Sequence, residues 1–196
     1  YIEAVKHNVL PIDNSKAERL DVRNRPNLTE GRTEFTYLPG MSRIPEGSAP
    51  DVKNRSWSVR ARIIVPADGA EGVIITQGGR FAGWGLYLRD GAPVFHYNLA
   101  GVERYEVAGQ RLGPGDHTVE FAFASDGKGP GMGGVGTLKV NDRSVGTTKF
   151  NRTLGFRISL DETLDCGHDT GTPVSEDYAV PYEFTGEIRD VVISLK

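Results

Sequence analysis

The sequence predicts an all-β protein, a two-sheet antiparallel sandwich of the jelly-roll type that is preceded by a short helical segment. Three observations lead to this prediction. Short runs of alternating apolar and polar residues recur along the chain, turn residues separate them, and no helical pattern is long enough for parallel crossovers. The 25 glycines and 11 prolines among the 196 residues fall largely between these runs, which is typical of a domain built from many hairpins.

The N-terminal third of the chain is the least regular part. In YIEAVKHN, Ile2 and Val5 are three positions apart and predict a helical turn, which Pro11 ends. Residues 21–55 are polar and proline-rich, with one strand expected at 33–37. A stretch this long without regular structure is typical of a segment that wraps over a neighbouring surface. We therefore predict three parts: residues 1–20 as the tail of a preceding domain, 21–55 as a wrapping segment and 56–196 as the β-sandwich.

The predicted sandwich begins with a clear two-residue period. In SWSVRARIIV, Trp57 and Val59 fall on one face, whereas Arg60 and Arg62 fall on the other. The pairs Asp90-Gly91 and Asn141-Asp142 are suited to tight hairpin turns and so predict antiparallel pairing. The expected strands cover residues 56–65, 72–77, 84–89, 93–98, 103–108, 117–124, 136–141, 144–150, 156–160 and 186–195.

Composition excludes several function classes. The formal net charge is -3, so the chain lacks the basic field that a nucleic acid partner requires. Its longest apolar runs are far too short to span a membrane. The single cysteine, Cys166, precludes an internal disulfide.

Several long blocks of this sequence resemble the C-terminal portion of a group of bacterial arylsulfatases. The blocks are YIEAVKHNVLPID, GRTEFTYLPGMSRIPEGSAPDVKNRSWSV, EGVIITQGGRFAGWGLYLRDGAPVFHYN and FRISLDETLDCGHDTGTPVSEDY, in that order. LYLRDGAPVFHY and FTGEIRDVVISL are similar to the hairpin and closing strand of concanavalin-like and laminin-G-like jelly rolls. The resemblance implies an accessory domain that follows a sulfatase catalytic domain in the same chain.

The resemblance also implies what a parent enzyme would need, namely a formylglycine residue and Ca²⁺. Formylglycine arises from a Cys or Ser that is followed by x-Pro-x-Arg. Cys166 is followed instead by Gly167, His168, Asp169 and Thr170. Because aspartates on both sides would raise the pKa of the thiol, we interpret Cys166 as chemically idle. We therefore expect no catalysis by residues 1–196 themselves.

Acidic residues concentrate near the C-terminus. Residues 161–187 hold eight carboxylates and no Lys or Arg. Such a segment can bind a structural Ca²⁺ through carboxylate oxygens, or it can form salt bridges with the more basic first part of the chain. Both interpretations stay open at this point. The candidate calcium ligands are Asp161, Glu162, Asp165 and Asp169.

Aromatic residues gather around the hairpin at residues 84–98. Aromatic rings can stack on sugar faces while polar neighbours bind the hydroxyl groups, although alternation in a sandwich should bury about half of these rings. The candidate glycan-binding residues are Trp84, Tyr87, Arg89, His96, Tyr97 and Asn98.

The leading hypothesis from the sequence is a non-catalytic domain that supports an arylsulfatase-like hydrolase structurally. The alternative is a carbohydrate-binding module that targets the enzyme to sulfated glycans. The expected partners are the catalytic domain, a glycan under the alternative hypothesis, and a second copy of the chain if the domain supports oligomer contacts. We expect a periplasmic or secreted location rather than a cytoplasmic one.

Overall fold

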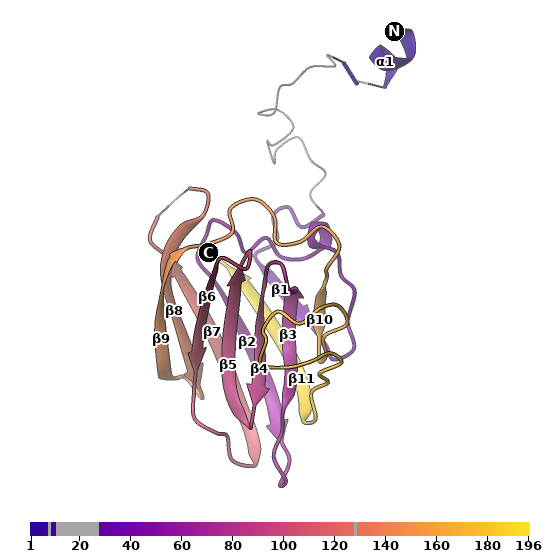
Figure 1. Ribbon diagram of the computed structural model, residues 1–196. Coiled ribbons are helices and arrows are strands. Elements are labelled where there is room, and N and C mark those ends of the chain that lie inside the picture. Colours follow the sequence, from indigo (N-terminus) through magenta and orange to yellow (C-terminus); the bar gives the residue numbers. More distant parts are fainter. Residues whose placement is uncertain (8, 11–27, 128) are drawn as a thin grey trace.

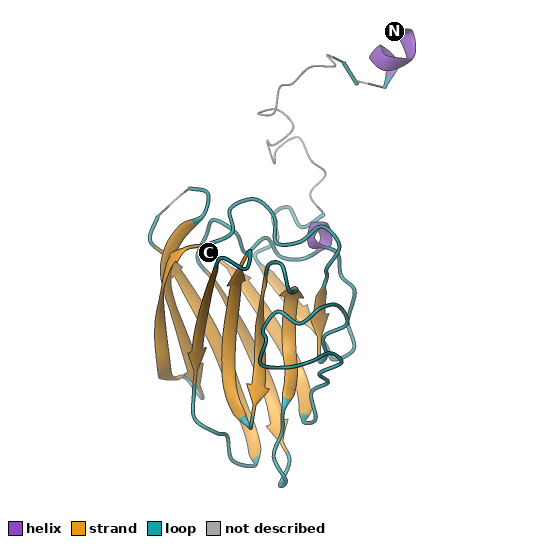
Figure 2. Cartoon of the chain, viewed as in Figure 1, coloured by secondary structure: helices purple, strands orange, loops and turns teal. Residues whose placement is uncertain are grey.

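A computed structural model describes residues 1–7, 9–10, 28–127 and 129–196, and it shows two antiparallel sheets packed face to face (Figures 1 and 2). The six-stranded sheet has the order β1-β11-β2-β7-β8-β9. It comprises β1 (Glu34–Tyr37), β11 (Glu187–Leu195), β2 (Trp57–Val65), β7 (Gly115–Ser125), β8 (Met132–Val140) and β9 (Arg143–Arg152).

The second sheet has five strands in the order β10-β3-β4-β5-β6. It comprises β10 (Leu164–Cys166), β3 (Gly72–Gly78), β4 (Gly83–Arg89), β5 (Ala92–Leu99) and β6 (Glu103–Ala108). The described helices are α1 (Ile2–Lys6) and the short 3-10 turn η2 (Glu46–Ser48). The predicted antiparallel two-sheet sandwich and the N-terminal helical turn are therefore both confirmed.

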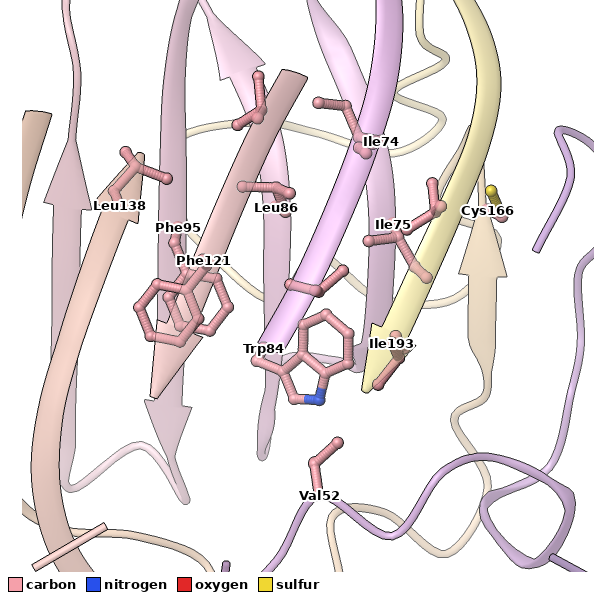
Figure 3. Packing of buried hydrophobic residues seen from close by; sticks show 14 of the residues in the cluster. Val52, Ile74, Ile75, Trp84, Leu86, Phe95, Phe121, Leu138, Cys166 and Ile193 are labelled. Atoms are coloured by element: carbon pink, nitrogen blue, oxygen red, sulfur yellow. The ribbon is translucent and has the colours of Figure 1, made fainter. Parts of the chain in front are cut away.

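The core lies between the two sheets, where alternate residues of facing strands meet. Phe95 on β5 and Phe121 on β7 stack across the interface with ring centroids 3.3 Å apart (Figure 3). Trp57 on β2 packs against Trp84 on β4 at 5.0 Å. Burying rings of this size removes 150–250 Å² each from water, so this aromatic cluster is a large source of stability.

Strands β3, β4 and β5 of the five-stranded sheet are buried on both faces, which a two-residue pattern alone does not predict, whereas β6 is exposed on its outer face. All seven residues of β3 are buried. The reason is that residues 167–184, named here the covering segment, cross the outer face of this sheet (Figure 1). Tyr178 of this segment packs with Val73, Tyr87 and Val94 in a small second core.

One predicted strand is wrong. Residues 156–160 form no strand, and one edge strand of the five-stranded sheet is β10 instead, inside the acidic residues 161–185 where we expected no strand. The amide groups of Ile158 and Ser159 donate to the Glu46 carboxylate, at 3.0 and 3.1 Å, and are thus satisfied without a partner strand. The backbone turns away here and leaves Phe156 and Leu160 exposed.

The sandwich also begins earlier than the predicted residue 56. Strand β1 pairs with β11, and its Phe35 and Tyr37 belong to the main core. Further along the same segment, Ala49 and Val52 are buried against the sandwich. The predicted boundary near residue 20 lies outside the described residues.

Candidate functional site

The outer face of the five-stranded sheet carries a cluster of ionisable side chains, named here the outer-face cluster: Arg89, His96, Glu106 and Asp177. The strand register places His96 on β5 directly opposite Glu106 on β6. Arg89 lies on β4, the strand that pairs with the other edge of β5. The covering segment brings Asp177 to the same place, where the Tyr87 hydroxyl donates to its carboxylate at 2.7 Å.

Ion pairs hold the outer-face cluster together. The Arg89 guanidinium donates to Glu106 at 3.1 Å and also to Asp177. Burial works against ionisation of Asp177, but the hydrogen bonds from Tyr87 and the charge of Arg89 bring its pKa below the usual value. Beside them, Arg104 donates to Glu176 at 2.8 Å. The charges at this face are therefore largely balanced within the molecule.

His96 is the most buried member of the outer-face cluster. Its side chain is only 7% exposed, and burial lowers the pKa of the imidazole, so the ring is neutral at neutral pH. The Nδ1 atom lies 3.5 Å from a carboxylate oxygen of Glu106, whereas Nε2 is buried and finds no hydrogen-bond partner in the part of the chain that the structure describes. His96, Glu106 and Asp177 each place one ligating atom within 4.8 Å of the others.

A second region lies at the end of the sandwich where segment 38–56 and segment 153–163 meet. Here a groove of about 360 Å³ opens to solvent; we call it the loop-end groove. Two large apolar side chains in its lining are exposed, Phe156 by 70% and Leu160 by 85%. An exposed aromatic ring beside polar groups is the arrangement that ligand sites use.

The polar groups of the loop-end groove are fixed by two partly buried salt bridges of Lys53. Lys53 bridges Glu46 and Asp51, with both N–O distances 2.7 Å, and Glu46 in turn binds the backbone of Ile158 and Ser159. The ionisable side chains in the lining comprise four acids and two bases: Glu46, Asp51, Asp161 and Glu162, with Lys53 and Arg157.

The six predicted glycan-binding residues do not form one surface. Trp84 and Tyr97 face the core: Trp84 donates to Gln77 at 3.0 Å, and the Tyr97 hydroxyl accepts from the Leu154 amide at 2.8 Å. Tyr87 is fully buried beneath Tyr178 of the covering segment. Because these three rings have no open face, a stacking platform on this hairpin is not what the structure supports.

The other three predicted glycan-binding residues do lie on the outer face. Asn98 joins two turns, because its amide donates to the Arg80 carbonyl at 2.8 Å and accepts from the Gly101 amide at 2.9 Å. Arg89 and His96 belong to the outer-face cluster. Sequence reasoning missed the loop-end groove because FRISL was assigned to a strand, which would have buried Phe156 or paired it with the sheet.

The four predicted calcium ligands are bound largely by the chain's own donors. Asp165 accepts from the Arg43 amide at 2.5 Å and from the Thr170 hydroxyl at 2.6 Å. Glu162 accepts from the Thr172 hydroxyl at 2.7 Å. Asp161 is exposed. Calcium binding by these residues stays a prediction.

Asp169, the fourth predicted ligand, is buried and accepts from the Tyr178 hydroxyl at 2.8 Å. Burial raises its pKa to about 6, and the charges of Asp165 and Glu162 add to this effect. The hydrogen bond therefore joins two parts of the covering segment, although burial disfavours the charged form of the carboxylate.

Cys166 lies in the core (Figure 3), where burial raises the pKa of its thiol to about 12. A thiol with this pKa carries almost no thiolate at neutral pH, and thiolate is the reactive form. The interpretation of Cys166 as a packing residue agrees with this environment.

Similar solved structures share the sandwich. The CBM40 domain of a Ruminococcus gnavus IT-sialidase, bound to α2,3 sialyllactose, is 17% identical with a TM-score of 0.55, and the match covers 83% of this chain and 85% of that one. The mouse laminin α1 chain, domains LG4-5, is 15% identical with a TM-score of 0.49, covering 84% of this chain and 39% of that one. The likeness to the CBM40 domain confirms the jelly-roll sandwich.

A third structure concerns botulinum neurotoxin type C, whose cell entry depends upon interaction with two ganglioside molecules. It is 15% identical with a TM-score of 0.49, and the match covers 72% of this chain and 33% of that one. This chain thus spans about a third of the neurotoxin chain and 39% of the laminin chain. No protein-family model and no curated protein sequence matches it.

Neither described helix has the length and apolar character that crossing a membrane requires.

Proposed function

We propose that this chain is a glycan-binding accessory domain and that the loop-end groove is its binding site. The observation that carries the proposal is the solvent-exposed ring of Phe156 in a groove whose volume lies in the range typical of small-ligand sites. Phe156 and Leu160 offer apolar surface to the C–H face of a sugar ring. The Asp161 carboxylate and the Arg157 guanidinium offer hydrogen bonds to its hydroxyl groups.

The charge of the loop-end groove favours neutral sugars. Its four carboxylates outnumber its two basic groups, and Lys53 is already committed to Glu46 and Asp51. A sulfate or a sialic acid carboxylate would therefore enter a negative field and would find only Arg157 to pair with. We propose uncharged glycans as ligands, in place of the sulfated glycans that the sequence alone led us to consider.

Two further observations support glycan binding without fixing the sugar. The CBM40 domain, which shares the sandwich, is bound to a sialylated sugar. The resemblance of the sequence to arylsulfatases makes a hydrolase the expected companion, so delivery of a catalytic domain to a polysaccharide is the role that we propose.

A glycan array followed by titration calorimetry on the full chain tests this proposal. We expect binding to a neutral oligosaccharide, and we expect Phe156→Ala to weaken it about tenfold, the loss of about 1.4 kcal/mol that an aromatic contact supplies. Phe81→Ala is the matched control, because Phe81 is 79% exposed but does not line the groove. Binding that survives Phe156→Ala, or binding to sulfated glycans alone, would contradict the proposal.

The same exposed side chains favour a second candidate function, packing against a neighbouring catalytic domain. Phe156 and Leu160 together form an apolar surface that a domain interface would bury. Under this alternative no glycan binds, and Leu160→Asp destabilises the whole enzyme while leaving the isolated sandwich unchanged. Differential scanning calorimetry of both forms separates the two functions.

A further inference from the structure

Three potential metal ligands converge on the outer face of the five-stranded sheet, away from the loop-end groove. His96 comes from β5, Glu106 from β6 and Asp177 from the covering segment, which is distant in sequence from both strands. One ligating atom of each lies within 4.8 Å of the others. The three atoms are thus close enough together for the side chains to draw in around one small ion.

The set of ligating atoms fits one class of ion. One imidazole nitrogen with two carboxylate oxygens matches Zn²⁺, which accepts both nitrogen and oxygen ligands and often keeps a fourth position for water. Ca²⁺ and Mg²⁺ prefer oxygen ligands alone and in larger number. We propose that His96, Glu106 and Asp177 form a zinc site that fastens the covering segment to the sheet.

A second observation points to a ligand at this place. The His96 side chain is more than nine-tenths buried, its Nδ1 atom is directed at Glu106 with a long contact of 3.5 Å, and its Nε2 atom has no partner among the described residues. Buried imidazoles normally have hydrogen-bonding partners. Without a short hydrogen bond at either nitrogen, this imidazole has an unused lone pair for a metal ion.

The Arg89 guanidinium supplies the positive charge that the two carboxylates require when no metal is bound. It pairs with Glu106 and Asp177 together. The Arg89 side chain is 35% exposed, so it can swing towards solvent when an ion takes over its role. Arginine and zinc thus compete for the same two carboxylates, and this competition gives the proposal a distinctive test.

Outer-shell contacts are also in place. The Tyr87 hydroxyl donates to the Asp177 carboxylate at 2.7 Å and would orient it toward the ion. Since Asp177 lies in the covering segment, zinc would join that segment to β5 and β6 and stabilise it. The proposal does not depend on glycan binding, because the loop-end groove contains none of these residues.

Titration calorimetry with ZnCl₂ on the untagged, EDTA-treated chain tests the site. We expect binding of one Zn²⁺ per chain, a higher melting temperature, and weak or undetectable heat with CaCl₂. Glu106→Gln should weaken zinc binding at least about tenfold, as loss of a ligand or its support does. Glu176→Gln is the matched control, because Glu176 pairs with Arg104 nearby but is not among the three ligands.

Two histidine variants and one arginine variant complete the test. His96→Gln should abolish zinc binding, whereas His117→Gln, on the other sheet, should not change it. Arg89→Met should strengthen zinc binding about tenfold, because the competing guanidinium is gone. Absence of zinc binding by the folded chain would overturn the proposal, and so would equal losses in the Glu106 and Glu176 variants or weaker binding by Arg89→Met.

Discussion

The outer face of the five-stranded sheet and the loop-end groove both carry several charged groups, yet they differ in what they leave for a ligand. On the outer face, Arg89 and Arg104 are paired with carboxylates, and the covering segment buries the Tyr87 ring. In the groove, the charged groups frame two exposed apolar side chains, Phe156 and Leu160.

A concentration of aromatic and charged residues therefore does not by itself mark a binding surface. Where the sequence places most rings, the fold uses them for its two cores, and the charges attach the covering segment. A sugar ring requires an accessible apolar face, which Phe156 provides and Trp84 does not. A single metal ion requires much less room, so the outer face stays suited to that smaller ligand.

The largest expected effect is the loss of stability on Trp84→Ala, which tests whether this ring belongs to the core and not to a binding surface. Trp84 is fully buried and contacts both Trp57 and Phe95. Removing a buried ring of this size typically costs about 3–5 kcal/mol. Urea unfolding monitored by circular dichroism measures the loss, with Phe81→Ala as the exposed control that should stay within about 0.5 kcal/mol. Equal stability of Trp84→Ala and the unmodified chain would contradict the assignment of Trp84 to the core.

A smaller loss of stability is expected where the covering segment crosses Gly83 and Gly85 of β4. A Cβ atom at Gly83 would lie 2.5 Å from the Gln77 carbonyl oxygen and 2.6 Å from the Val174 side chain. Gly83→Ala should therefore displace both the paired strand β3 and the covering segment, and destabilise the chain by about 1–3 kcal/mol. Limited proteolysis should cut within residues 167–184 faster than in the unmodified chain.

Gly113 gives the matched comparison for that experiment, because a Cβ atom there meets nothing within 4 Å and its backbone is not left-handed. Gly113→Ala should leave the proteolysis pattern unchanged. If Gly83→Ala is cut no faster than Gly113→Ala, then the covering segment does not pack closely on β4.

The smallest expected effect is the pH dependence of stability that Asp169 causes. The pKa of Asp169 is about 6 in the folded chain, compared with about 3.9 for an unfolded aspartate. The stability that the protonated Asp169 carboxyl contributes is fully present below pH 4 and is lost as pH rises through 6. Between pH 4 and pH 7 the unmodified chain should lose roughly 1–2 kcal/mol of its free energy of unfolding through this carboxyl group. Asp169→Asn should not show this loss.

Melting temperatures recorded from pH 4 to pH 7 measure this effect. Asp161→Asn is the control, because it removes a nearby exposed carboxylate and leaves Asp169 and Tyr178 in place. A profile for Asp169→Asn that is as steep as that of the unmodified chain would show that Asp169 is not the group responsible.

The sequence predicts the sheets well because alternation and turn residues are local signals. SWSVRARIIV becomes β2 with Trp57, Val59 and Ala61 buried, and Asp90-Gly91 forms the turn between β4 and β5. These properties follow from neighbouring residues, so no tertiary information is required to recognise them.

The candidate sites were harder to predict because they depend on contacts between distant segments. FRISL has the alternation of a strand, but Glu46 satisfies its amide groups from more than 100 positions away and exposes Phe156. The glycines at 83 and 85 were a usable signal, since consecutive small residues on one face leave room for a crossing segment. The identity of that segment could not be inferred from them.

Backbone amide NMR during titration with a neutral oligosaccharide is the most direct test of the central claim, that the loop-end groove and not the outer face is the glycan-binding surface. We predict the largest chemical-shift changes in residues 156–162 and at Asp51 and Lys53, with little change at Arg89, His96 or Asn98. Largest changes on β4, β5 and β6, with residues 156–162 unaffected, would contradict the account.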